Sequence, residues 1–136
     1  MHQLIGTWRF SHSILMDDQY TVMPNDPMNT ANGILMYVDT GYMSVHLQMP
    51  DTQNENFSIQ LLTPYIAYFG KFHIEGERHI VTHEILGSNV PDVIGKTVQR
   101  CFDFENESAM SLINPIPEKV ATKEAIFRKV FWNRVS

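Results

Sequence analysis

Four polar side chains fall within runs that a small β-protein would bury: Tyr37, Tyr68, His83 and Arg100. A phenol and an imidazole can donate or accept a proton near neutral pH or hold one in a hydrogen bond. A guanidinium can bind a carboxylate or polarise a carbonyl oxygen. If the fold brings these groups together, they could orient a small molecule or act on it as acid and base.

The elements that must position them are strands. Short runs rich in Val, Ile, Tyr and Phe, separated by Gly, Pro, Asn and Asp, predict eight of them. Their expected ranges are 6–15, 33–38, 42–48, 66–75, 78–86, 97–104, 109–114 and 125–134. A further extended piece is expected near 20–23, and one short helix within 49–65. The spacing favours an antiparallel sandwich or a closed barrel, and a barrel leaves no exposed edge. We therefore predict an all-β, closed antiparallel β-barrel formed by a single domain, residues 1–136.

Turn residues set which side chains face inward. Gly76 and Glu77 predict a two-residue turn with Gly76 at positive φ. This register pairs Ile74 with His79, Phe72 with Val81, Gly70 with His83, and Tyr68 with Ile85, all on the inner face. The His83 imidazole would then lie over Gly70, and the glycine would also permit a sharp bend.

The segment "VDTGY" predicts a three-residue loop with Gly41 in the left-handed region. The inward set is then Leu35, Tyr37, Met43, Val45 and Leu47. Ile34, Met36 and Val38 remain outside, which suggests a partner surface for a homodimer or a wrong register. In 97–104 the apolar alternation turns Val98, Arg100, Phe102 and Phe104 inward and Cys101 outward.

An inward Arg100 is the strongest signal for a ligand. A buried guanidinium is costly without a partner, and no inward position of the predicted strands carries a carboxylate. The hypothesis is that Arg100 meets an anionic or carbonyl group on a mostly apolar ligand. The predicted ligand-binding residues are Tyr37, Met43, Tyr68, His83, Arg100 and Phe102. The structural alternatives are wall packing by Tyr37, gap filling by Met43, and a His83–Tyr68 pair that only orders the barrel.

Composition argues against several other functions. The net charge of −5 and the lack of a basic run argue against nucleic acid as a partner. No secretory signal and no membrane span are expected, and the single cysteine, Cys101, favours the cytoplasm. His79 and His83 share a face, but four residues of strand separate them too far for one metal ion. We expect no metal and no cofactor.

Several segments together resemble a known family. "IGTW" at 5–8 is similar to the Gly-x-Trp opening of the calycin superfamily. "ANGILMYVDTGYMSV", "YIAYFGKFHIEGERHIVTHEI", "VIGKTVQRCFDF" and "FWNR" resemble the bacterial and fungal lipocalin-like domain family over nearly the whole chain. The resemblance implies a small up-and-down barrel with one open mouth, and Arg134 stacked over the N-terminal Trp8. It implies little about chemistry, since one fold serves many functions.

Three functions remain open at this point. The first is a binding module for a small hydrophobic molecule, with the loop 16–32 gating the mouth. The second is a cofactor-independent cyclase or isomerase, with His83 or Tyr68 as acid or base and Arg100 stabilising an enolate-like oxygen. The third is a structural or interaction barrel with a filled interior.

Overall fold

The computed structural model describes residues 2–17, 19, 21–23, 31–49, 65–113 and 127–135. Strands make up most of these residues, with a single turn of 3-10 helix, η2 (Pro91–Val93). The strands are β1 (Gly6–Met16), β2 (Val22–Met23), β3 (Asn32–Tyr37), β4 (Tyr42–Gln48), β5 (Tyr65–Glu75), β6 (Ile80–Ser88), β7 (Thr97–Asn106), β8 (Ala109–Ile113) and β9 (Phe127–Arg134).

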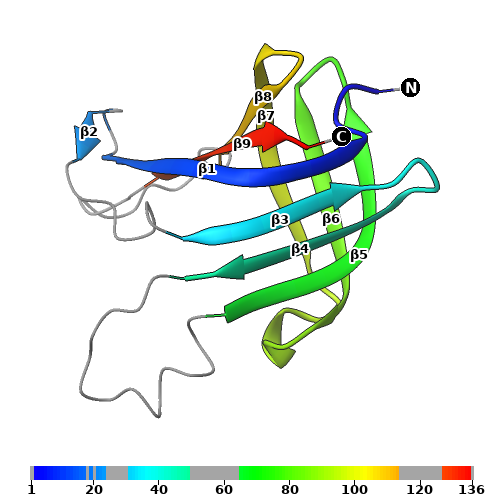
Figure 1. Cartoon of the computed structure of the whole chain (residues 1–136). Helices are drawn as coiled ribbons and strands as arrows, with labels where there is room; N and C mark the ends of the chain where they lie inside the picture. The colour runs from blue at the N-terminus through cyan, green and yellow to red at the C-terminus, as the bar shows by residue number, and fades with distance from the viewer. Residues whose placement is uncertain are drawn as a thin grey trace, which may run out of the picture.

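The strands form a closed antiparallel barrel (Figure 1). From β3 to β9 each strand pairs with the next in the sequence, and β1 pairs with both β3 and β9. The two-residue β2 pairs only with the end of β1. The predicted all-β, up-and-down barrel of about eight strands is therefore confirmed.

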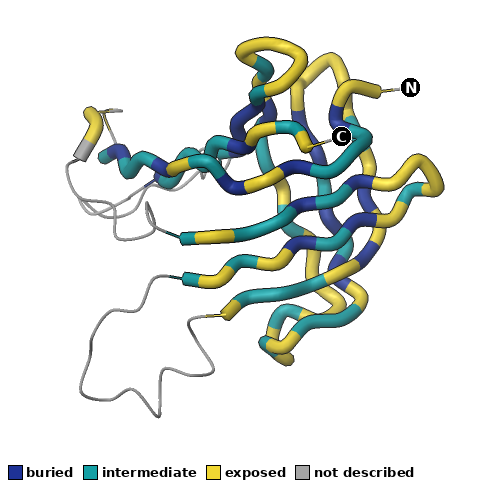
Figure 2. The backbone as a smooth tube through the Cα atoms, viewed as in Figure 1, coloured by how far each residue is buried: buried dark blue, intermediate teal, exposed yellow. Residues whose placement is uncertain are grey.

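The predicted hairpin between β3 and β4 has the expected register. Ile34 pairs with His46 and Met36 with Ser44. Gly41 has a φ of 95°, so a side chain there would be strained. The predicted inward residues of both strands are buried, apart from the half-buried Leu47, and buried and exposed stretches alternate along the strands (Figure 2).

The predicted register of the β5–β6 hairpin was wrong. Phe72 pairs with His83, and Ile74 pairs with Val81 instead of His79. The connecting loop has four residues, and its positive φ of 55° belongs to His79 rather than to Gly76. His79 is therefore exposed in the loop and does not face inward as predicted. Because partners moved by two residues, Phe72, His83 and Val81 stay on the inner face.

The structure gives a different reason from the predicted one for a glycine at position 70. It pairs with Ile85, at a register shift between Phe69 and Gly70. A Cβ atom at Gly70 would lie 1.8 Å from the backbone carbonyl oxygen of Glu84. The close approach of two backbones, rather than the His83 ring, excludes a side chain here. The irregularity lies within the long, curved β5 (Figure 1).

One end of the barrel is closed by an arginine over a tryptophan. The Arg134 guanidinium lies 4.2 Å from the Trp8 ring centroid, as the resemblance implied. It also donates to the backbone carbonyls of Gln3, Ile5 and Glu107. The indole N–H of Trp8 donates to the carbonyl of Leu4 at 2.9 Å. Every polar group of this pair thus has a partner.

Some predictions lie outside the described residues. The expected helix within 49–65 and most of the expected gating loop 16–32 belong to this group. The outer strip is described: Ile34 and Met36 are half-buried, and Val38 is exposed. A homodimer through this strip stays a prediction. No helix in the described part of the chain is long and apolar enough to cross a membrane.

Candidate functional site

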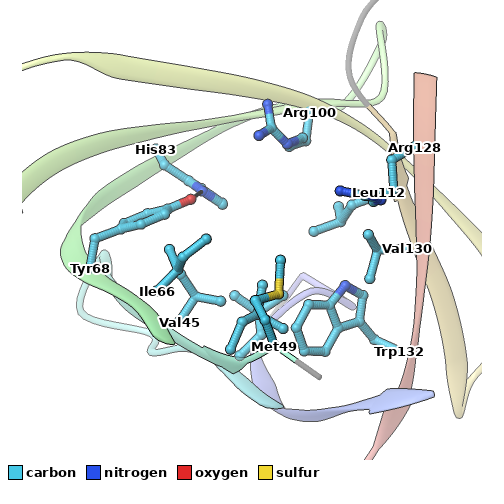
Figure 3. Close-up of a pocket in the computed structure, with 12 residues that line it drawn as sticks. Val45, Met49, Ile66, Tyr68, His83, Arg100, Leu112, Arg128, Val130 and Trp132 are labelled. Carbon is cyan, nitrogen blue, oxygen red and sulfur yellow. Dashed lines mark hydrogen bonds between the residues drawn. The ribbon is translucent and has the colours of Figure 1, made fainter. Parts of the chain in front are cut away.

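A cavity of about 280 Å³ lies inside the barrel, toward the end where β4 ends and β5 and β9 begin. This volume is near the lower limit of ordinary small-molecule sites. Most of its wall is apolar, and the polar side chains project into it from several strands (Figure 3). The described lining residues are Leu35, Val45, Leu47, Met49, Ile66, Tyr68, His83, Arg100, Leu112, Arg128, Val130 and Trp132.

A chain of three hydrogen-bonded side chains forms one side of the cavity. The Tyr68 hydroxyl lies 2.7 Å from Nδ1 of His83, and the Tyr37 hydroxyl lies 2.6 Å from Nε2. Tyr37 comes from β3, Tyr68 from β5 and His83 from β6. Tyr37 is 1% exposed and His83 is 2% exposed. Both ring nitrogens are therefore engaged by phenol oxygens in the interior.

The bonding pattern determines where the protons lie. A neutral imidazole has one N–H donor and one acceptor nitrogen, so one tyrosine donates to it and the other accepts. The fully buried Tyr37 hydroxyl has no other described partner, so its proton would be left unpaired unless it is donated to Nε2. Nδ1–H of His83 then donates to the Tyr68 oxygen. The O–H of Tyr68, which lines the cavity, remains available to a ligand.

Burial keeps all three members of this chain uncharged. Desolvation, followed by the nearby Arg100 charge, lowers the pKa of His83 to about 3. Desolvation raises the pKa of Tyr68 to about 12, with Arg100 acting in the opposite direction. The pKa of Tyr37 is raised well above its usual value, mainly by desolvation. At neutral pH the hydrogen-bonded Tyr37, His83 and Tyr68 side chains therefore carry no net charge and act only through their dipoles.

Arg100 projects into the same cavity from β7, where it pairs with Val81. Its described hydrogen bond is from one terminal nitrogen to the backbone carbonyl of Gln99, at 2.8 Å. No carboxylate among the described residues forms an ion pair with it. Burial lowers the pKa of Arg100, although the two tyrosines of the chain oppose that effect. The guanidinium keeps its charge and most of its donors for another group.

Trp132 on β9 is a site residue that the sequence did not indicate. It lines the cavity and is only 3% exposed, yet its Nε1–H has no hydrogen-bond partner among the described groups. Buried polar groups are almost always paired, so an unpaired one requires a reason. Arg128, two alternations earlier on the same strand, also lines the cavity. The period-two alternation from Arg128 through Val130 to Trp132 was the available signal.

The structure brings together three of the six predicted ligand-binding residues at the cavity wall: Tyr68, His83 and Arg100. Tyr37 lies behind them and contacts His83 without lining the cavity. Met43 and Phe102 are buried in the core cluster, away from the lining. The role of each residue in binding stays a prediction, as does any catalytic role of His83, Tyr68 or Arg100.

The described residues contain no group of three or more His, Cys, Asp or Glu side chains that could hold a metal ion. Cys101 is half-buried and pairs with Ile80 and Ile113 on the neighbouring strands.

Comparison with known proteins identifies the family. A model of the lipocalin-like domain matches residues 5–135, so the chain belongs to this family. No curated protein matches the chain. Among solved structures, the chain is similar to a redesigned β-barrel, with 11% identity and a TM-score of 0.47. That alignment covers 98% of this chain and 93% of the other.

Proposed function

We propose that this protein binds one small, mostly apolar molecule whose anionic or carbonyl group meets Arg100 inside the barrel. The observation that carries the proposal is Arg100 at the cavity wall: none of the described lining residues is acidic, and no described carboxylate forms an ion pair with this guanidinium. The chain as a whole has a net charge of −5. A guanidinium at the cavity wall without a described acidic partner, within an acidic protein, favours a ligand that supplies negative charge.

The hydrogen-bond pattern supports the same ligand chemistry. Tyr68 offers an O–H to the cavity, and Arg100 offers N–H groups, so both of these described groups are donors. A carboxylate or a carbonyl oxygen can accept from both. The apolar wall, which includes Val45, Ile66 and Leu112, would bury the rest of the molecule.

Two of the alternatives receive less support. A filled interior does not fit the cavity of about 280 Å³. Cyclisation or isomerisation through proton abstraction needs a base, but Nδ1 of His83 carries a proton and Nε2 accepts from Tyr37. Catalysis would therefore depend on Tyr68 and Arg100 polarising a carbonyl oxygen, with a base from elsewhere. The cytoplasmic location is proposed on the single cysteine alone.

Binding of a matched pair of probes tests the proposal. Decanoate and decanol have the same tail and differ in the charge of the head group, and calorimetry gives the affinity of each. We expect decanoate to bind at least ~10-fold more tightly than decanol, since a hydrogen bond to a charged group is worth that much or more. Arg100→Met should abolish the preference, whereas the control Arg9→Met, on the exposed face of β1, should retain it.

Equal affinities for the two probes, or a preference that survives in Arg100→Met, would contradict the proposal. Native mass spectrometry of the protein isolated from its own host adds an independent measurement. A co-purified molecule with an acidic or carbonyl group would support the proposal, and a cationic one would contradict it.

A further inference from the structure

The Trp132 indole carries a further hydrogen-bond donor at the cavity wall. Its Nε1–H is buried and lacks a described acceptor, whereas the only other tryptophan, Trp8, has its N–H bonded to Leu4. The two residues have the same chemistry and similar burial, but only one of them lines the cavity. Leaving such a donor unpaired costs stability, because it has lost water without gaining a partner.

Trp132 lies away from Arg100 in the cavity. Arg100 enters the cavity from β7 and Trp132 from β9, and Figure 3 shows them on opposite sides, with Tyr68 on a third. Arg128, Leu112 and Val130 line the wall between them, so Trp132 and Arg100 are not neighbours in the cavity (Figure 3). One oxygen group bound at Arg100 and Tyr68 therefore leaves the indole N–H unpaired.

We infer that the ligand carries a second hydrogen-bond acceptor, separate from its anionic group, which the Trp132 Nε1–H binds. The inference rests on the proposed function and narrows the ligand to a class: an apolar acid with a carbonyl, hydroxyl or ether oxygen elsewhere along its body. A hydrocarbon acid would satisfy Arg100 and leave the indole unpaired. An oxygenated acid would form hydrogen bonds with both Arg100 and the Trp132 N–H. The protein should therefore bind it more tightly than a hydrocarbon acid of the same length.

A set of oxodecanoic acids with the ketone at successive chain positions provides the test, with decanoate as the reference. In ¹H–¹⁵N spectra of the labelled protein, the Trp132 indole resonance is assigned from its loss in Trp132→Phe. We expect one or two ketone positions to move this resonance downfield, as a new hydrogen bond does, while the bonded Trp8 indole stays in place. The same acids should bind ~5-fold or more tightly than decanoate.

Trp132→Phe keeps an aromatic ring but removes the N–H donor together with part of the indole. It should therefore erase the gain of the oxoacids over decanoate, and decanoate measured on the same variant accounts for the lost packing. If no ketone position shifts the resonance or improves binding, the inference is overturned while the proposed function stands, because decanoate still binds through Arg100. If neither the oxoacids nor decanoate bind the wild-type protein, both fall. If Trp132→Phe folds poorly, the two indole resonances of the wild-type protein are assigned from their through-space contacts with neighbouring protons, and the ketone series is still measured on the wild-type protein.

Discussion

The barrel contains two arginine–tryptophan combinations that differ in one respect. At the closed end, Arg134 stacks on Trp8 and donates to three backbone carbonyls, and the Trp8 indole has its own acceptor. At the cavity, Arg100 has one described hydrogen bond, to a neighbouring carbonyl, and the Trp132 indole has none. The same two residue types are thus fully paired in one place and largely unpaired in the other. Paired groups stabilise the fold, whereas a buried donor without a partner lowers its stability. Under the proposed function, the unpaired donors at the cavity are the groups that bind the ligand.

The largest expected effect is on stability at the closed end. Arg134→Ala removes three charge-assisted hydrogen bonds and a cation–π contact, and should lower the free energy of unfolding by about 3–5 kcal/mol. Urea denaturation measures the change. Arg100→Met is the matched control at the cavity: it should change stability by less than about 1 kcal/mol or increase it, because it removes a half-buried charge that has no described acidic partner. A larger loss of unfolding free energy in Arg100→Met than in Arg134→Ala would contradict the proposed difference between the paired and the unpaired arginine.

Acidic pH should destabilise the protein because His83, at the cavity, resists protonation in the folded state. The pKa of His83 is about 3 in the folded protein and 6.5, the ordinary value, in the unfolded chain. Between these two pH values the unfolded chain binds a proton at His83 and the folded protein does not. Stability from this group is present above pH 6.5 and is lost as the pH falls toward 3, by ~1 kcal/mol for each pH unit. Denaturant unfolding at several pH values measures the slope.

His83→Gln keeps one donor and one acceptor but cannot titrate, so its stability should fall less steeply between pH 6.5 and 4 than that of the wild type. His73→Gln, on the exposed face of the same hairpin, is the control and should keep the wild-type slope. Parallel slopes for wild type and His83→Gln would mean that the histidine does not stay neutral in the fold.

The smallest expected effect is a difference in ligand affinity between variants of the two tyrosines that flank His83. Tyr68→Phe removes a donor that faces the cavity and should weaken decanoate binding ~5-fold. Tyr37→Phe removes a hydroxyl whose proton is given to the histidine, and should change the affinity by less than ~2-fold while costing about 1–2 kcal/mol of stability. Calorimetry and urea denaturation measure the two quantities. If Tyr37→Phe weakened binding as much as Tyr68→Phe, the assigned proton positions would be wrong.

Much of the fold could be predicted from the sequence because alternation and turn chemistry are local. Gly41 closes a three-residue loop, which fixed the partners of Ile34 and Met36 correctly. The β5–β6 turn was mispredicted because Gly76 is the residue expected at positive φ, although a histidine can also adopt this conformation. The predicted register was displaced by two residues. Because side chains alternate between faces with a period of two, the pairing partners changed but the inward and outward faces did not.

The site was less predictable because it depends on where space remains. Arg100, His83 and Tyr68 were expected to face inward because of their positions within apolar alternations, and they line the cavity. Met43 and Phe102 share that alternation but pack in the core, since inward direction alone does not distinguish the cavity from the filled end. The unpaired state of Trp132 depends on which strands surround its N–H, and no sequence pattern records that.

The seam between β1 and β9 also determines when the barrel can form during synthesis. Trp8 pairs with Arg134, so residues near the two ends of the sequence must meet before the sheet closes (Figure 1). Until β9 leaves the ribosome, β1 and β8 would each present a bare row of amides to other nascent chains. Contacts between such distant residues also slow folding. The barrel therefore depends on its last strand for protection against aggregation.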